Sequence, residues 1–402
     1  MSNMMGMKEK KSIIIVPEQA AQKAEHSRHR HKGPRLLTIL LSILALMALI
    51  HFFIAAYITG ATPPVSDCMA LIRSTDYTQV VHLQTSQEMD AVQFVDSLTG
   101  GQPAALVSVT NAGSQNALDV YVYSCTMQKH IPKLNSLFMQ RGLVQGTVAI
   151  SSQNTLITSE LDPLASPQDS TVEQPLQQNI YREYAWRNGT FVQIAFPSLY
   201  PVVSRGEAEA LQQEADTGQI LPWSDPYITA EQMAKDILNW PDNNPQDAVL
   251  SNDGTTAKVK LVQQNPGLDV TVILKRLVEQ NSKGLWFVVG AQTAGITLKS
   301  VGQSSQPTGQ QQGLPLHVSS LTFQGTGLLA DGQTTTTLFD HTLTPLNLNG
   351  VSLSVDGNGA YSGTLSYAQI APGQQGILLI QSLPPAGSTE VGQLLLTSVI
   401  LG

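Results

Sequence analysis

The longest apolar run of the chain lies near its N-terminus. Residues 36–58 contain no Lys, Arg, Asp or Glu. At about 1.5 Å per residue, a helix of this length spans about 34 Å, which exceeds the roughly 30 Å hydrocarbon core of a bilayer. A buried helix of a soluble domain is shorter and usually carries a polar stripe. The pattern therefore predicts a single transmembrane helix over 36–58, preceded by a tail at 1–35.

The charges on either side of this run predict its orientation. The tail holds eight Lys/Arg and three Glu, whereas the first basic residue after the run is Arg73. Since the more basic flank stays in the cytoplasm, we expect a single-pass signal-anchor in the plasma membrane, with residues 62–402 extracellular. Cleavage near Ala61 is the alternative, because small residues follow the run, but the run is long for a signal peptide.

Three histidines stand in the basic stretch before the predicted helix, at His26, His29 and His31. They could bind a metal ion. A basic collar on anionic lipid headgroups explains the same stretch, because each Lys or Arg near the surface adds up to about 1 kcal/mol of attraction. We favour the collar and predict no metal site.

The exterior chain opens with a pattern typical of an α+β module over 66–197. Apolar residues at helical spacing predict helices at 86–98 and 131–140. Strands are predicted at 104–110, 118–125, 144–150 and 155–160. Asn188-Gly189 separates two alternating segments, which indicates a hairpin with a type I′ turn. Asn188 to Thr190 also match a glycosylation sequon, but the turn accounts for the same residues.

A connector with a helix at 205–215 is predicted over 198–225, followed by a second α+β module over 226–302. Thr229 and Gln232 form a capping box, which predicts a helix starting at Thr229. The strands of the module are predicted at 248–251, 256–263, 268–279, 285–291 and 296–301. This order indicates one helix packed on a meander sheet.

The C-terminal part of the chain is predicted to be a β-sandwich at 315–402, after a polar linker at 303–314. About seven short strands alternate there with Gly- and Pro-containing turns, a spacing typical of a sandwich. The predicted fold class is thus a transmembrane helix followed by α+β and all-β exterior modules.

Residues 361–402 contain a strand, a turn at Pro372-Gly373, an apolar strand ending near Ser382, a turn and a last apolar strand. This order resembles the end of the immunoglobulin-like module of bacterial germination and envelope lipoproteins. Residues 315–350 depart from that family, since its Ser-Pro and Phe-Glu landmarks are missing. The whole plan resembles bacterial single-pass cell-envelope proteins with tandem β-rich modules. The resemblance implies an extracytoplasmic binding or scaffolding role.

Composition excludes several classes of protein. The net charge is −8, and a nucleic-acid binder would need a basic patch or stripe on its folded part. Two cysteines exclude a disulfide-dense scaffold and a cysteine-rich zinc site. We expect no nucleic-acid partner.

No catalytic motif with a known mechanism occurs in the chain. The exterior histidines, which stand isolated in sequence, are His82, His130, His317 and His341. The carboxylates Asp162, Asp169, Glu173 and Asp225 are scattered at no catalytic spacing. We therefore predict no catalytic residue, no cofactor and no metal site.

Two further sequence patterns can each be interpreted in two ways. Asp356-Gly-Asn358-Gly resembles the start of a calcium loop, but the expected downstream Glu is missing, and a tight hairpin explains it better. Four tryptophans could stack on sugars, although three of them fit the core face of a strand or helix. These residues are Trp186, Trp223, Trp240 and Trp286.

The two cysteines are the best candidate pair. Cys68 precedes the first predicted helix and Cys125 ends a predicted strand, and both lie on the side of the membrane where disulfides persist. We predict a Cys68–Cys125 disulfide, with two free buried thiols as the alternative.

The predicted function is a non-enzymatic binding or scaffolding role at the cell envelope, with a protein or a glycan as partner. Two alternatives remain open. One is an envelope hydrolase whose site combines residues distant in sequence. Two titratable groups that converge in a pocket would favour this alternative. The other is a signalling adaptor that offers residues 12–17 as a docking strand in the cytoplasm.

Overall fold

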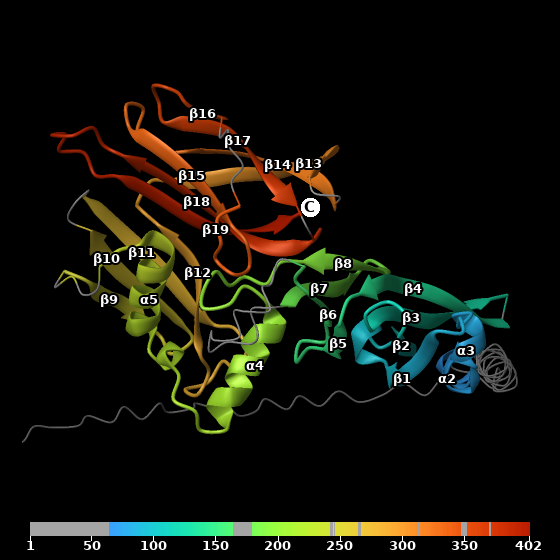
Figure 1. The fold of residues 1–402 in the computed structure, drawn as a ribbon. Coiled ribbons are helices and arrows are strands. Elements are labelled where there is room, and N and C mark those ends of the chain that lie inside the picture. The colour runs from blue at the N-terminus through green and yellow to red at the C-terminus, as the bar shows by residue number, and fades with distance from the viewer. Residues whose placement is uncertain are drawn as a thin grey trace, which may run out of the picture. The chain divides into compact units, whose positions relative to one another are not determined.

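Alternating apolar and polar residues dominate the chain after residue 63, and strands accordingly make up most of the structure (Figure 1). This computed structural model describes residues 64–402 except 130, 164–178, 242–243, 245, 264–266, 312–313, 347–351 and 370. The predicted tail at 1–35 and transmembrane helix at 36–58 lie outside the described residues. Within the described part, no helix has the length and apolar character needed to cross a membrane.

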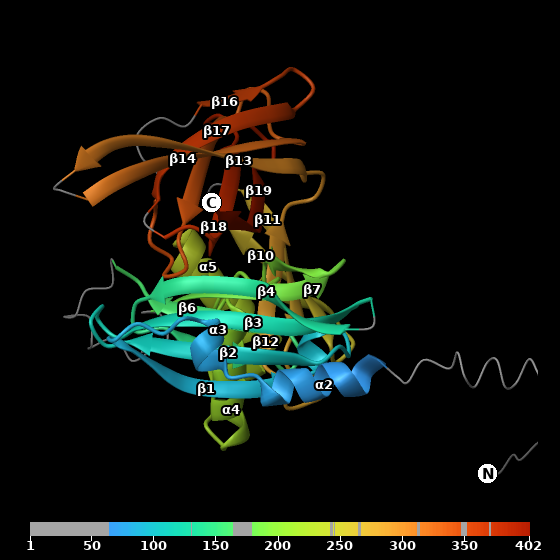
Figure 2. The same ribbon diagram turned by 90° about the vertical axis from the view of Figure 1, so that its right-hand side faces the viewer.

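The first sheet is antiparallel, and two helices lie against one of its faces (Figure 2). Its strands are β1 (Gln87–Val95), β2 (Ala104–Asn111), β3 (Ala117–Gln128) and β4 (Ile131–Leu143), in that order. The helices are α2 (Pro64–Ser74) and α3 (Tyr77–Val80), and a 3-10 turn, η1 (Ser97–Thr99), follows β1. The strands predicted at 104–110 and 118–125 are confirmed and pair as a hairpin.

The helices predicted at 86–98 and 131–140 are wrong, because β1 and β4 occupy those residues. In β1 the register shifts between Met89 and Ala91, so Met89 and Val92 contact the same core although they are three positions apart. The bulge thus reproduces the spacing of a helix face. In β4, Pro132 is tolerated because this strand is at the edge of the sheet.

A second antiparallel sheet packs on the other face of the first. Its strands are β5 (Thr147–Ile150), β6 (Leu156–Leu161), β7 (Asn179–Arg187) and β8 (Thr190–Ile194), in that order. Leu156 of β6 shares a core with Leu106 and Val120 of the first sheet. At the β7–β8 turn, Asn188 and Gly189 have φ angles of 51° and 82°, which confirms the predicted type I′ hairpin.

Residues 198–225 belong to a core and do not serve as a mere connector. They include α4 (Arg205–Asp216), which confirms the helix predicted at 205–215, and the 3-10 turn η3 (Pro222–Ser224). Leu199, Tyr200 and Trp223 are buried in the same cluster as the strands that follow. The prediction failed because these apolar residues are too few and too irregularly spaced to indicate packing.

Helix α5 (Pro226–Leu238) begins three residues before the predicted start, so the capping box at Thr229 is wrong. The carboxylate of Asp225 accepts hydrogen bonds from the backbone N–H groups of Tyr227 and Ile228, and Pro226 takes the first helical position. Thr229 lies inside the helix, where its hydroxyl donates to the Asp225 carbonyl.

Strands from both predicted C-terminal modules join in one seven-stranded antiparallel sheet. Its order is β15 (Gln333–Phe339), β18 (Gln374–Leu383), β19 (Gln393–Leu401), β12 (Trp286–Gln292), β11 (Leu268–Arg276), β10 (Thr256–Gln263) and β9 (Ala248–Asn252). Strands β12 and β19 meet at Ala291 and Leu396. The predicted boundary between 226–302 and 315–402 therefore does not separate two independent sheets.

The linker predicted at 303–314 is wrong for the residues described there, because they continue two paired strands. Strand β13 (Thr297–Gln311) pairs antiparallel with β14 (Leu314–Thr326), which in turn pairs with β17 (Ala360–Gln369). With β16 (Ser352–Val355) they form a four-stranded sheet, β13-β14-β17-β16. Backbone hydrogen bonds hold this polar segment in the sheet, although its composition is typical of a loop.

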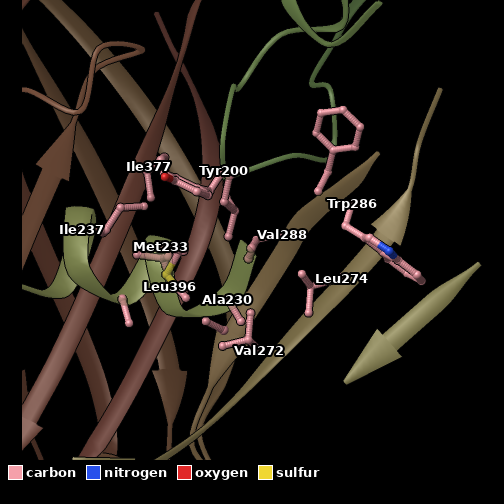
Figure 3. Close-up of a cluster of buried hydrophobic side chains, with 14 of the residues drawn as sticks. Tyr200, Ala230, Met233, Ile237, Val272, Leu274, Trp286, Val288, Ile377 and Leu396 are labelled. Atoms are coloured by element: carbon pink, nitrogen blue, oxygen red, sulfur yellow. The ribbon is translucent and has the colours of Figure 1, made fainter. Parts of the chain in front are cut away.

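The C-terminal part is built of β-strands, as expected, but its two packed sheets also include β9–β13, from outside the predicted module at 315–402. Leu321 and Leu365 of the four-stranded sheet share a core with Leu378 and Ile380 of β18. The alternate residues of the seven-stranded sheet point the other way, as Figure 3 shows for Ile377 and Leu396, which pack with Met233 of α5. Since β18 and β19 are buried on both faces, their sequences contain apolar runs such as Ile377–Ile380 and Leu394–Leu396.

Candidate functional site

The two cysteines selected from the sequence form a disulfide. Cys68 of α2 and Cys125 of β3 have Cα atoms 5.4 Å apart, within the usual range of about 4.4–6.8 Å. Both residues are buried in the core that the helices share with the first sheet. The bond spans a sequence separation of 57 residues and fixes the first described helix to the sheet.

Tyrosine rings pack in the same core as the disulfide. The rings of Tyr77 and Tyr123 have centroids 5.7 Å apart, and the Tyr77 hydroxyl donates to the Ile72 carbonyl at 2.9 Å. Burial raises the pKa of Tyr77 to about 12, and the nearby Tyr123 adds to this rise. Tyr77 is therefore neutral at physiological pH and holds α2 and α3 together.

His341 is not isolated, contrary to the prediction. Its buried ring places Nε2 2.9 Å from Asp162 Oδ2, although 179 positions separate the two residues. His82 is exposed, whereas His130 and the side chain of His317 lie outside the described residues. Of the other predicted carboxylates, Asp169 and Glu173 also lie outside them, and Asp225 caps α5.

These two residues belong to a larger group of buried charges, which we term the buried ionic cluster. Its members are Asp162, Glu183, Arg205, Glu207 and His341. They come from the end of β6, from β7, from α4 and from the loop after β15. The cluster therefore joins the second sheet, α4 and the C-terminal part of the chain, which no local sequence signal could indicate.

Glu207 sits in the first turn of α4 and completes a capping box with Ser204. The Ser204 hydroxyl accepts from the Glu207 N–H at 3.2 Å and donates to Glu207 Oε2 at 2.7 Å. The other oxygen, Oε1, is buried with no hydrogen-bond partner among the described residues. Burial raises the pKa of Glu207 to about 7, against the smaller lowering by Ser204 and His341. This carboxyl is therefore partly protonated near neutral pH.

Opposing effects act on His341. Burial lowers the pKa of its imidazole, but the hydrogen bond to Asp162 and the charges of Glu207, Asp162 and Asp340 outweigh burial and raise the pKa above its usual value. Its Nδ1 is buried without a hydrogen-bond partner in the described part of the chain. The imidazole thus retains a proton more readily than an exposed histidine.

An arginine–carboxylate pair occupies the other side of the cluster. Arg205 Nε lies 2.6 Å from Glu183 Oε1, which also accepts from the Thr155 hydroxyl at 2.6 Å. Next to this pair, Arg182 contacts Glu160 at 2.6 Å and donates through Nε to the Pro372 carbonyl at 2.8 Å. Arg182 thus connects the second sheet to the segment that enters β18, and Arg205 connects α4 to the second sheet.

A cavity of about 10 Å³ lies beside Arg205 and Glu183, with Phe196 and Gln375 also in its wall. A space of this size holds about one water molecule and excludes an organic substrate. Among the residues described, no group of three or more His, Cys, Asp or Glu side chains is arranged to hold a metal ion.

Three of the tryptophans considered as sugar platforms contact the protein core. Trp223 and Trp286 are buried in the core of the seven-stranded sheet, and Trp240 packs against it. Trp186 is half-buried beside Phe191, with ring centroids 5.1 Å apart. The expectation that three tryptophans serve packing is confirmed.

The segment Asp356–Gly359 is a hairpin turn between β16 and β17, as expected. Asp356 Oδ1 accepts hydrogen bonds from the backbone N–H groups of Asn358 and Ala360, each at 2.8 Å. Gly359 has a φ of 77°, which the turn requires. The carboxylate therefore stabilises the turn itself.

A polar depression lies on the outer face of the sheet β13-β14-β17-β16. It has a volume of about 390 Å³, within the roughly 300–1,000 Å³ typical of ligand sites. We term it the hydroxyl trough and define it by its polar side chains: Ser300, Thr322, Gln324, Ser352, Ser354, Ser362 and Thr364. Sequence reasoning missed the trough, because its residues are polar positions of strands that only pairing brings together.

No protein-family model matches this chain, and no curated protein matches it. The similarity of residues 361–402 to the immunoglobulin-like module of bacterial envelope lipoproteins stays a prediction.

Proposed function

We propose that this chain is a membrane-tethered extracytoplasmic protein with a non-enzymatic binding or scaffolding role at the cell envelope. The charge-free run at 36–58 and the eight Lys/Arg before it supply the tether and its orientation. The strands and helices after residue 63 form the exterior part.

The Cys68–Cys125 disulfide is the observation that carries this proposal. Disulfides persist in oxidising compartments and are rare in the cytosol. The bond lies on the C-terminal side of the apolar run, which the positive-inside rule assigns to the exterior. Redox chemistry and charge distribution, two independent lines of reasoning, thus agree on the compartment.

The position of the disulfide also suits a tethered protein. Cys68 comes ten positions after the end of the apolar run and is bonded to β3 inside the first sheet. A force applied at the anchor is therefore transmitted to the sheet through the covalent bond. The packing of α2 against Tyr77 and Tyr123 does not have to resist this force. This arrangement favours a scaffold that bears load.

An envelope hydrolase is the second candidate, because Glu207 and His341 converge in the buried ionic cluster and each has a polar atom without a hydrogen-bond partner among the residues described. The cavity beside the cluster has a volume of only about 10 Å³. Since a cavity of this size cannot hold an organic substrate, we favour binding over hydrolysis. The docking strand of the signalling alternative, at residues 12–17, lies outside the described residues.

Protection of terminal tags in intact bacterial cells tests the proposal. The full chain carries a different tag at each end, and protease is added before and after permeabilisation. We expect the C-terminal tag to be digested in intact cells and the N-terminal tag only after permeabilisation. Protection of both tags, or loss of the N-terminal tag alone, would overturn the proposed location.

A second measurement examines the disulfide in the same cells. Rapid alkylation of unreduced chains should leave both cysteines unmodified, whereas reduction first should add two alkyl groups per chain. Two reactive thiols without reduction would contradict the oxidising compartment.

A further inference from the structure

The C-terminal part of the chain has an unusual charge composition. From residue 300 onward neither Lys nor Arg occurs, and the acidic residues are Asp331, Asp340, Asp356 and Glu390. Surfaces of soluble domains usually carry about 25–35% charged side chains of both signs. The solvent-facing strands of this region therefore depend on uncharged polar groups.

The hydroxyl trough shows how these groups are arranged. Strand pairing sets Ser352, Thr364 and Thr322 side by side across three strands. Ser354, Ser362 and Gln324 form the next row in the same way. All six side chains are exposed, while the residues between them face the sandwich core.

The trough extends across all four strands of its sheet. Ser300 of β13 lies opposite Gln324 and lengthens the second row. With neighbouring strands about 4.8 Å apart, four strands span roughly 14 Å, which is longer than one sugar ring. Gly302 of β13 has no side chain, and the Thr322 hydroxyl lies over it, donating to its carbonyl at 3.2 Å.

The chemistry of the trough selects a class of ligand. A hydroxyl can donate one hydrogen bond and accept two, and the Gln324 amide does both. The Thr322 hydroxyl already donates to Gly302 and the Ser354 hydroxyl to Ser362, so these two meet a ligand as acceptors. Phosphate, sulfate or carboxylate groups are held by Arg and Lys, and the trough contains neither. Its side chains match a ligand that is itself a neutral array of hydroxyls.

We propose that the hydroxyl trough binds a neutral polysaccharide chain of the cell surface, an inference that rests on the proposed extracytoplasmic binding role. The aromatic rings nearest the floor, Phe323 and Tyr361, are buried on the core side of the sheet. Hydrogen bonds therefore hold the sugar, without ring stacking. Single contacts of this kind are weak, and many tethered copies on one polysaccharide strengthen the attachment.

Calorimetric titration of the purified full chain in detergent micelles tests this inference. The probes are two neutral polysaccharides, a soluble β-1,3-glucan and a galactomannan, with polygalacturonate as the anionic comparison. We expect binding to at least one neutral probe and none to polygalacturonate. Failure of both neutral probes to bind, or binding of polygalacturonate alone, would overturn the inference.

A double variant locates the binding. Thr322→Val with Thr364→Val removes two hydroxyls and keeps the shape and strand propensity of both side chains. Loss of two hydrogen bonds should weaken binding about tenfold or more. The matched control is Thr190→Val on β8, which is also exposed and lies outside the trough. Equal affinity of the double variant and the control would place the ligand elsewhere.

The unfolding midpoint and the terminal tags distinguish the possible outcomes of these experiments. An unchanged unfolding midpoint shows that the double variant is folded. If the tags show an extracellular C-terminus but neither neutral probe binds, the trough inference fails and the proposed location stands. If the tags show a cytoplasmic C-terminus, the location and the cell-surface ligand both fail.

Discussion

His341 Nε2 lies 2.9 Å from Asp162 Oδ2 in the protein interior. Asp162 follows β6 of the second sheet, and His341 follows β15 of the seven-stranded sheet. Glu207 of α4 and Asp340 add negative charge around the same imidazole. One histidine thus connects three parts of the chain.

Stability should fall as the pH rises from about 5 to 8. The pKa of Glu207 in the folded state is about 7, above its usual 4.5, and the pKa of His341 is raised as well. Both groups bind a proton more tightly in the folded state than in the unfolded state. The stability gained from this binding is complete at pH values below the pKa that each group has in the unfolded chain. This stability is lost as the pH passes the folded pKa, at a cost on the order of 3 kcal/mol for Glu207.

Urea unfolding at several pH values, for the wild type and for Glu207→Gln, checks this prediction. The variant cannot ionise at residue 207, so its stability should depend less on pH and should equal or exceed that of the wild type at pH 8. The pKa values of Asp76 and Asp253 are lowered by hydrogen bonds to Thr78 and Thr255, so these groups act only at lower pH. The same pH dependence in both proteins would contradict the assignment.

Removal of the disulfide should destabilise the first sheet. For a closed loop of about 57 residues, the chain-entropy model gives a loss of about 4 kcal/mol. Cys68→Ala with Cys125→Ala should therefore lower the free energy of unfolding by roughly this amount. Added reductant should destabilise the wild type similarly and leave the double variant unchanged. If the reductant also destabilised the double variant, its effect on stability would not arise from the disulfide alone.

Much of the fold follows from local sequence. Asn188 and Gly189 have the positive φ angles of a type I′ turn, and the hairpin on each side of them is confirmed. The failures have specific physical causes. A bulge at Met89 imitates helical spacing, and the polar segment at 303–311 is held in a strand by backbone pairing with β14.

The site was less predictable than the fold. The Cys68–Cys125 pair was predictable because the chain contains only two cysteines on the exterior side. The partner of His341 could not be identified, because 179 positions separate it from Asp162 and many carboxylates lie between them. The hydroxyl trough depends on the register of four strands, and single-strand patterns do not determine register.

The true cap of α5 can be tested directly. Asp225 accepts hydrogen bonds from two backbone N–H groups, whereas Gln232 donates to Asp236 on the helix surface. Asp225→Ala should therefore lower the free energy of unfolding by about 1 kcal/mol. Gln232→Ala should cost less than about 0.5 kcal/mol. The reverse order would restore the capping box at Thr229.

The continuity of the seven-stranded sheet predicts coupled stability across the boundary expected at 303–314. Leu274 of β11 is fully buried in a core that also contains Ile377 of β18 and Leu396 of β19 (Figure 3). Leu274→Ala should cost about 2–5 kcal/mol through lost burial and the cavity it leaves. Because β12 pairs with β19, strands on both sides of the expected boundary should share this loss.

Native-state hydrogen exchange measures the loss strand by strand. The opening free energy of backbone amides in β18 should fall with Leu274→Ala by about as much as in β11. The matched control is Leu250→Ala on the edge strand β9, where the side chain is 55% exposed and little protection should be lost. If Leu274→Ala reduced protection in β11 and left β18 unchanged, the two halves of the sheet would unfold independently. The predicted boundary at 303–314 would then separate two units of independent stability.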